Sequence, residues 1–180
     1  MKDRISEIDE LFKMFHDFDI HTLELEDRIL TMRISIPWCE MWEIDEYILT
    51  FKFTECDEFS CIYHVRTSTE LVQWEKGVYY PNEKKVTTDI GVIEKMELDV
   101  QNHEFLEPNT FYLNCNSSTS FGNQIGQIDF GQIIMKASNY QVFDPGGEEI
   151  ELSQLKLWEN DWWKSIEKMH EDNKKRNNLE

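Results

Sequence analysis

Two stretches in the first third of the chain alternate apolar and polar residues, and this pattern constrains the fold more than any other feature. The stretches are Ile29–Ile36 and Tyr47–Thr54. Successive side chains of a β-strand point to opposite faces, so each stretch predicts a strand with one buried face. We expect the two to be paired, antiparallel strands. The side chains expected to face one core are Leu30, Met32, Ile34 and Ile36.

Apolar runs bounded by turn residues predict the remaining strands. They are expected at about Ile20–Leu25, Phe59–Arg66, Gly91–Val100, Thr110–Asn114, Ile125–Met135 and Tyr140–Phe143. The polar stretches Asn102–Asn109 and Asn114–Asn123 are expected to be connections, and Asp144–Gly147 a turn. Residues 67–90 are compatible with a short helix or a strand, with turns and an edge strand within Gly77–Lys85.

Apolar residues spaced three and four apart predict a helix at each end of the chain. The first carries Ile5, Ile8, Leu11, Phe12 and Phe15, and the second, at about Ser153–Asn173, carries Leu155, Trp158, Trp162, Ile166 and Met169. Strands joined by short turns between two such helices favour a β-rich α+β fold. We therefore expect a single domain over residues 1–180, with an antiparallel sheet or sandwich, an N-terminal helix and a C-terminal helix.

The chain is strongly acidic, with 36 Asp and Glu against 18 Lys and Arg and a net charge of -18. Such a surface repels nucleic acid and anionic membranes and speeds association with a basic partner. No apolar run approaches the ~20 residues of a membrane helix, and Met1–Glu10 has no hydrophobic core of a signal peptide. We expect a cytoplasmic protein that binds neither nucleic acid nor membrane, with its oligomeric state left open.

The four cysteines, Cys39, Cys56, Cys61 and Cys115, are expected to be reduced and buried. Zinc sites usually take a second pair of ligands beside a short Cys or His pair. The group Cys56, Cys61 and His64 has no such second pair, so we expect no metal site and no cofactor.

No catalytic motif is present: the sequence contains neither G-x-S-x-G nor G-x-x-x-x-G-K-[ST]. His16, Asp17 and His21 lie close in sequence, but no nucleophile accompanies them by motif. We expect a binding protein without catalytic residues. The alternative is a small-molecule-binding or hydrolytic domain with an aromatic-lined pocket, in which His16 or His64 does the chemistry. A closed apolar cavity with a perturbed histidine would favour that alternative.

Acidic residues are concentrated in residues 1–60, which carry 16 Asp and Glu against 6 Lys and Arg. The candidate binding residues for a basic protein partner are Glu43, Asp45, Glu46, Glu55, Asp57 and Glu58. Trp163 follows Trp162 on the predicted C-terminal helix, about 100° around the helix axis. If exposed, Trp163 is a candidate aromatic anchor for the same partner.

The segment FHDFDIHTLELEDRILTMRIS, Phe15–Ser35, resembles the start of a family of immunity proteins from bacterial polymorphic toxin systems. In that family a short helix precedes a Phe-His-Asp segment and a hairpin of amphipathic strands, matched here by Phe15, His16, Asp17 and the alternating strands. The resemblance implies a β-rich α+β protein with no enzymatic activity and no cofactor, which neutralises a cognate toxin. A basic toxin, such as a nuclease, would fit the acidity of this chain.

Overall fold

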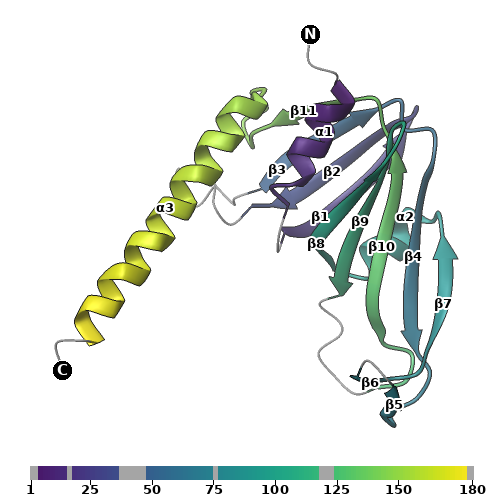
Figure 1. The fold of residues 1–180 in the computed structure, drawn as a ribbon. Helices are drawn as coiled ribbons and strands as arrows, with labels where there is room; N and C mark the ends of the chain where they lie inside the picture. Colours follow the sequence, from purple (N-terminus) through teal and green to yellow (C-terminus); the bar gives the residue numbers. More distant parts are fainter. Residues whose placement is uncertain (1–3, 16–17, 37–47, 75–76, 118–123, 178–180) are drawn as a thin grey trace.

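A nine-stranded antiparallel sheet organises the protein, with a short helix near the N-terminus of the chain and a long helix near its C-terminus (Figure 1). The computed structural model describes residues 4–15, 18–36, 48–74, 77–117 and 124–177. In chain order the elements are α1 (Arg4–Phe12), β1 (Phe18–Glu26), β2 (Ile29–Ser35), β3 (Ile48–Thr54), β4 (Phe59–Arg66), β5 (Val72–Trp74), β6 (Gly77–Tyr79), β7 (Asn82–Thr87), α2 (Ile90–Glu94), β8 (Leu98–Leu106), β9 (Thr110–Ser117), β10 (Ile128–Lys136), β11 (Asn139–Phe143) and α3 (Leu152–Asn177). The β-rich α+β fold class predicted from the sequence is therefore confirmed.

The strand order is β11-β3-β2-β1-β8-β9-β10-β4-β7, and β5 and β6 form a separate hairpin. The β1–β8 junction has only two registered pairs, Phe18 with Val100 and Asp19 with Asp99. The sheet therefore consists of two halves joined over a short length. Because the halves separate beyond this junction, a core can form between them.

Aromatic rings of α1 fill the space between the two halves of the sheet. The Phe12 ring lies 5.3 Å from that of Phe53 on β3 and 5.4 Å from that of Phe111 on β9, measured between centroids. All three side chains are fully buried. One helix residue thus contacts both halves, which makes α1 part of the core and not only a cover over it.

The predicted pairing of the two alternating strands is confirmed. β2 and β3 are antiparallel neighbours, with Leu30 opposite Phe53 and Met32 opposite Phe51. The four residues expected to face one core, Leu30, Met32, Ile34 and Ile36, are all buried. Alternation was a sufficient guide here because one face of this pair is apolar throughout.

The predicted strand over Gly91–Val100 is wrong in its first half. Residues 90–94 form α2, where the Asp89 carboxylate caps the helix by accepting a hydrogen bond from the Val92 N–H. Strand β8 begins at Leu98 and continues to Leu106, through the first part of the predicted connection Asn102–Asn109. In this part a polar residue, His103, faces inward against α1, and an apolar residue, Leu106, is exposed, so the segment lacks the alternation that indicates a strand.

Other boundaries also differ from the prediction. β9 extends to Ser117 within the predicted connection Asn114–Asn123, and residues 118–123 lie outside the described residues. Residues 67–90, which were compatible with helix or strand, contain β5, β6 and β7. β7 lies at one edge of the sheet, as expected for part of Gly77–Lys85.

The long helix α3 begins beside β11 and extends away from the sheet (Figure 1). Leu155 is buried, while Trp158 and Trp162 are partly buried and pack against the core. A further connection to α1 comes from the ion pair between Lys156 and Glu10. No helix within the described part of the chain is both long and apolar enough to cross a membrane.

Candidate functional site

The acidic candidate residues are only partly placed by the structure. Glu43, Asp45 and Glu46 lie outside the described residues. Glu55, Asp57 and Glu58 lie in the connection between β3 and β4, and all three are exposed.

Trp163 is half-exposed on α3, at 50% of its full accessible surface. Its ring packs edge-to-face on Trp162, with centroids 4.7 Å apart. α3 and the β3–β4 connection lie on opposite sides of the molecule (Figure 1). The structure therefore does not bring Trp163 together with the acidic residues, and its role as an anchor stays a prediction.

Four connections between strands meet at one end of the sheet. Three backbone hydrogen bonds join them: Cys56 N–H to Arg28 O at 2.8 Å, Ser138 N–H to Thr54 O at 3.2 Å, and Ala137 N–H to Asn109 O at 3.2 Å. The connections are β1–β2, β3–β4, β8–β9 and β10–β11. The six exposed carboxylates in or beside these connections, which we call the acidic turn surface, are Glu26, Asp27, Glu55, Asp57, Glu58 and Glu107.

Two basic residues pair with carboxylates of the acidic turn surface. Arg28 lies 2.5 Å from Asp57, and Lys136 lies 2.6 Å from Glu58. No ion pair is formed by the other four carboxylates with any described residue. The acidic turn surface and its two cations thus carry a net charge of about -4. Of the six carboxylates in the acidic turn surface, only those of the β3–β4 connection were candidate binding residues from the sequence. The sequence did not predict that the other connections lie beside it, because this depends on the strand pairing.

The metal and thiol predictions can be compared with the structure at β4. Cys61 is fully buried in the core, whereas His64 lines the opposite face of the strand. Burial raises the pKa of the Cys56 and Cys61 thiols to about 11, and also raises that of Cys115. These three cysteines are free and buried as predicted, and Cys39 lies outside the described residues. Within the described ranges, no group of three or more His, Cys, Asp or Glu residues could hold a metal ion.

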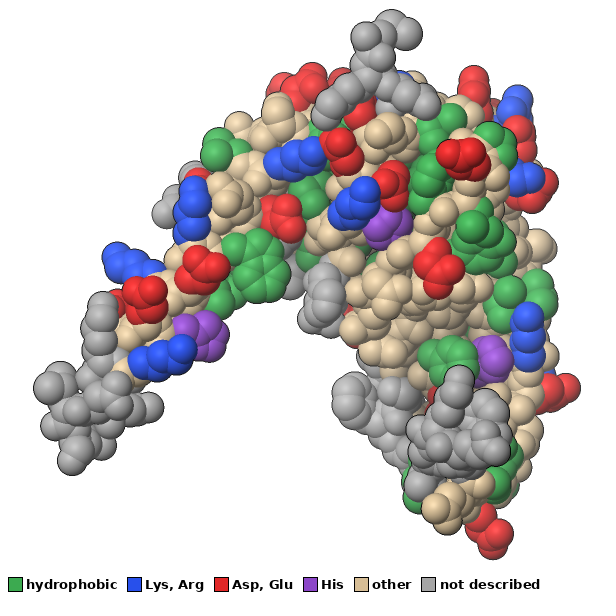
Figure 2. All heavy atoms as spheres, in the orientation of Figure 1, with side chains coloured by type: hydrophobic (Ala, Val, Ile, Leu, Met, Phe, Trp, Pro, Cys, Tyr) green, Lys and Arg blue, Asp and Glu red, His purple; other side chains and the backbone are tan. Residues whose placement is uncertain are grey.

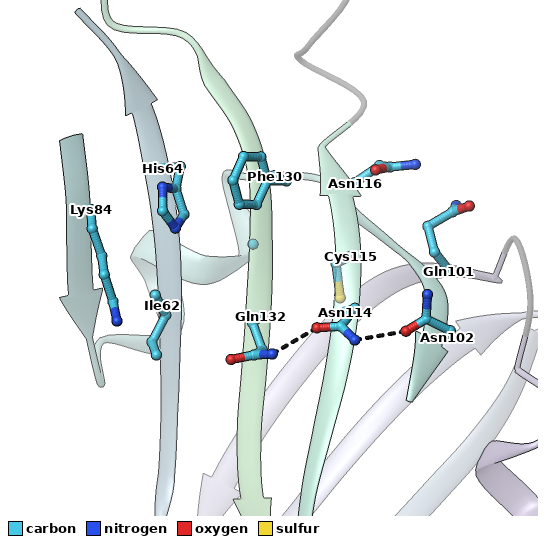
Figure 3. A pocket seen from close by; sticks show the side chains of 11 residues that line it. Ile62, His64, Lys84, Gln101, Asn102, Asn114, Cys115, Asn116, Phe130 and Gln132 are labelled. Carbon is cyan, nitrogen blue, oxygen red and sulfur yellow. Dashed lines mark hydrogen bonds between the residues drawn. The ribbon is translucent and has the colours of Figure 1, made fainter. Parts of the chain in front are cut away.

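A row of side-chain amides crosses the middle of three neighbouring strands (Figure 3). Gln132 on β10 donates a hydrogen bond to Asn114 on β9, and Asn114 donates to Asn102 on β8, each at 2.7 Å. The strand register places these residues opposite one another in pairs. We call Gln132, Asn114 and Asn102 the amide row.

The amide row lines an open hollow of about 390 Å³ together with an aromatic pair. The rings of His64 and Phe130 stack with centroids 4.2 Å apart, and His64 Nδ1 lies 2.9 Å from Asn82 Oδ1. Among the described residues that line the hollow, none carries a carboxylate, and Lys84 is the only Lys or Arg. In Figure 2 the sheet face beside the hollow is mostly tan, the colour of backbone and uncharged polar side chains, with few Asp, Glu, Lys or Arg side chains.

The hollow does not favour the small-molecule or hydrolytic alternative, which called for a closed apolar cavity. It is open, and five of the eleven described residues that line it are amides. Of the other histidines considered, His16 lies outside the described residues, and His21 is exposed on β1. The amide row had no counterpart among the candidate residues, because it forms only through the pairing of three strands.

No protein-family model, curated protein or solved structure matches this chain.

Proposed function

We propose that this protein is a non-enzymatic binding protein that associates with a basic protein partner through its acidic turn surface. The observation that carries the proposal is the convergence of six exposed carboxylates from four connections, with two cations among the described residues paired to them. Four carboxylates are therefore available to Lys and Arg side chains of a partner.

The physical basis is long-range attraction followed by contact pairing. A surface of one charge sign raises the association rate with a partner of opposite sign, and salt screens the effect beyond ~8 Å at physiological ionic strength. Acids on sequence-distant connections form a broad surface of this kind. An isolated acidic turn would act over a smaller area.

The sharper form of the proposal is an immunity protein that masks a basic toxin. It is supported by the resemblance of Phe15–Ser35 to that family, a segment that includes the β1–β2 hairpin and thus part of the acidic turn surface. A toxin that acts on nucleic acid needs cationic groups to bind phosphates. An acidic protein seated on those groups would compete directly with the substrate.

The test is the association rate of this protein with a basic toxin encoded beside its gene, measured by biolayer interferometry over a salt series. The variant Glu26→Gln/Asp27→Asn/Glu107→Gln removes three carboxylates that pair with no described residue. The control variant Glu70→Gln/Glu167→Gln/Glu171→Gln makes the same change in net charge at other exposed positions.

We expect the first variant to slow association at least about fivefold at low salt, and the control by less than about twofold. The difference should disappear at high salt. Equal effects of the two variants would mean that net charge, and not the acidic turn surface, governs association. An association rate that changes neither with salt concentration nor in either variant would overturn the proposal.

A further inference from the structure

We propose that the amide row binds the backbone of an extended peptide segment from another protein. The amide row crosses the middle of the sheet, and the hollow extends from it past His64 and Phe130, away from the acidic turn surface. The inference does not depend on the function proposed for those acids.

The hydrogen bonds within the amide row leave it with a defined polarity. Gln132 uses an N–H, and Asn102 uses its oxygen. Asn114 uses its oxygen and its Nδ2 group, which donates to Asn102 and also to Glu104. The Gln132 Oε1 atom therefore remains as an acceptor at one end of the row, and the Asn102 Nδ2 group remains as a donor at the other. Both ends border the hollow and face out from the same side of the sheet (Figure 3).

The spacing of these two groups matches that of an extended peptide. Neighbouring strands lie about 4.8 Å apart, so the amide groups of Gln132 and Asn102, which are two strands apart, are centred roughly 9.6 Å from each other. In an extended chain, the N–H of one residue and the C=O two residues later point to the same side, about 9 Å apart. Such a peptide can donate to Gln132 and accept from Asn102 while it crosses the strands.

A side-chain amide is also the group best suited to this task. It carries the same N–H donor and C=O acceptor as a peptide group, and it is uncharged. Recognition through these groups depends on the peptide backbone and only weakly on its sequence. This mode is hydrogen bonding to a strand laid across a sheet face, and it differs from the addition of a strand at the sheet edge.

An apolar surface continues the amide row on the side of Gln132. Ile62 on β4 lies opposite Gln132, and Val86 on edge strand β7 lies opposite Ile62. Val86 is 62% exposed, and Phe130, which also borders the hollow, is 43% exposed. An apolar side chain at the N-terminal end of the bound segment would cover these groups and supply the hydrophobic part of the binding energy.

The charge of this surface selects against the partner expected at the acidic turn surface. Lys84 lines the hollow, and the carboxylate of Glu104 on β8 accepts a hydrogen bond from Asn114 at 3.4 Å. One cation and one carboxylate thus lie beside the amide row, so a segment of strong charge of either sign gains little here. The expected ligand is an uncharged extended segment with an apolar residue near its N-terminal end.

The experiment is selection from a phage-displayed library of random 12-residue peptides on the full chain, followed by titration of synthetic peptides into 15N-labelled protein. The test variants Gln132→Ala and Asn102→Ala each remove one end of the amide row. Gln73→Ala, at an exposed amide on β5, is the matched control. Far-UV circular dichroism and thermal melting confirm folding, and Gln132→Met is the replacement if Gln132→Ala is unstable.

We expect selected peptides to shift the side-chain amide resonances of the amide row, and to bind each test variant at least tenfold more weakly than the control. Methylation of a single peptide backbone nitrogen should weaken binding by a similar factor. Affinity should change little between 50 mM and 500 mM salt, which separates this result from any failure at the acidic turn surface.

Three outcomes would overturn the inference. The first is a library that yields no peptide whose binding depends on both ends of the amide row. The second is that selected peptides tolerate methylation at every backbone nitrogen, and the third is that only oligosaccharides on a glycan array bind through these amides.

Discussion

At one end of β4 and β10, exposed carboxylates pair with Arg28 and Lys136. From the middle of these strands to their other end lie the amide row, the stacked rings of His64 and Phe130, and the ion pair of Arg66 with Asp129. The pair at the first end is exposed, with Lys136 and Glu58 at 32% and 65% of their full side-chain accessibility. At the second end, Arg66 and Asp129 form an ion pair, and their side chains expose only 6% and 14% of their full accessible surface. The same strands therefore present charge that acts at long range and polar groups that act only on contact.

This difference teaches how one sheet can serve two kinds of recognition. Exposed charges affect the approach of a partner and are weakened by salt. Neutral amides act only on a partner already in contact with the surface, because hydrogen bonds require donor and acceptor atoms about 3 Å apart. Separate perturbation of the two ends should therefore give effects of different size and different salt dependence.

The largest expected effect is the loss of the buried ion pair at the amide end. Arg66 Nε donates to Asp129 Oδ2 at 3.3 Å, and the guanidinium lies 3.8 Å from the centre of the Tyr80 ring. Arg66→Met leaves the Asp129 carboxylate buried without its cation. We expect the free energy of unfolding in urea to fall by about 3 to 5 kcal/mol.

The matched change at the acidic end is Arg28→Met, because Arg28 also pairs with an aspartate. Its partner Asp57 is exposed, so the expected cost is about 0 to 1 kcal/mol. The double variant Arg66→Met/Asp129→Leu should recover much of the stability lost in the first case. Similar costs for the two single variants would contradict the contrast between the ends.

The sequence predicted the strands best where one face is apolar, as in β2 and β3. It failed at β8 because His103 faces inward and Leu106 is exposed there, which breaks the alternation. The amide row could not be predicted, since it depends on a register shift between Val100 and Asn102 that brings Asn102 opposite Asn114. Pairing between residues distant in sequence sets this alignment.

The acidic candidates show the same limit. Exposure of Glu55, Asp57 and Glu58 followed from the composition of a short acidic turn between two strands. The pairing of Asp57 with Arg28 and of Glu58 with Lys136 could not be predicted in this way, because these cations come from other parts of the chain. Local composition predicts where charges lie along the chain, and the fold decides which charges meet.

A second, smaller effect is expected at the carboxylate that joins α1 to β8. Asp9 lies 2.8 Å from the His103 ring nitrogen and 2.6 Å from Lys13 Nζ. Burial opposes ionisation of Asp9, but the hydrogen bonds and charges of Lys13 and His103 outweigh it and hold the pKa below the ordinary value of 3.8. Asp9→Asn should lower the free energy of unfolding at pH 7 by about 1.5 to 3 kcal/mol.

The pH dependence gives the sign of this contribution. A folded-state pKa below the unfolded value means that the carboxylate stabilises the fold above the unfolded pKa, and that this stabilisation is lost as pH falls through the folded pKa. The gap between wild type and Asp9→Asn should therefore narrow in urea titrations below pH ~4. A gap that stays constant down to pH ~2 would show that the charge of Asp9 does not contribute.

Removal of the central amide of the row should have a still smaller effect on stability. Asn114→Ala deletes three side-chain hydrogen bonds, with Gln132, Asn102 and Glu104, but these partners are partly accessible and can bond to water instead. We expect a loss of about 1 kcal/mol in urea unfolding, with little change between 50 mM and 1 M salt. A strongly salt-dependent cost would mean that the nearby Glu104, and not the amides, dominates this end.

The smallest expected effect is at the acidic turn surface, where Asp57→Asn/Glu58→Gln removes both paired carboxylates. The lost ion pairs are exposed and contribute little, since ordering two long side chains offsets much of their attraction. Removing two negative charges from a chain of net charge -18 also relieves repulsion among the remaining carboxylates. The two terms oppose each other, so the free energy of unfolding should change by less than about 0.5 kcal/mol at 150 mM salt.

At 10 mM salt the repulsion reaches further than the pairing does. There the variant should be at least as stable as the wild type, and a loss above about 2 kcal/mol would show that these turns hold the fold together instead of presenting charge to a partner.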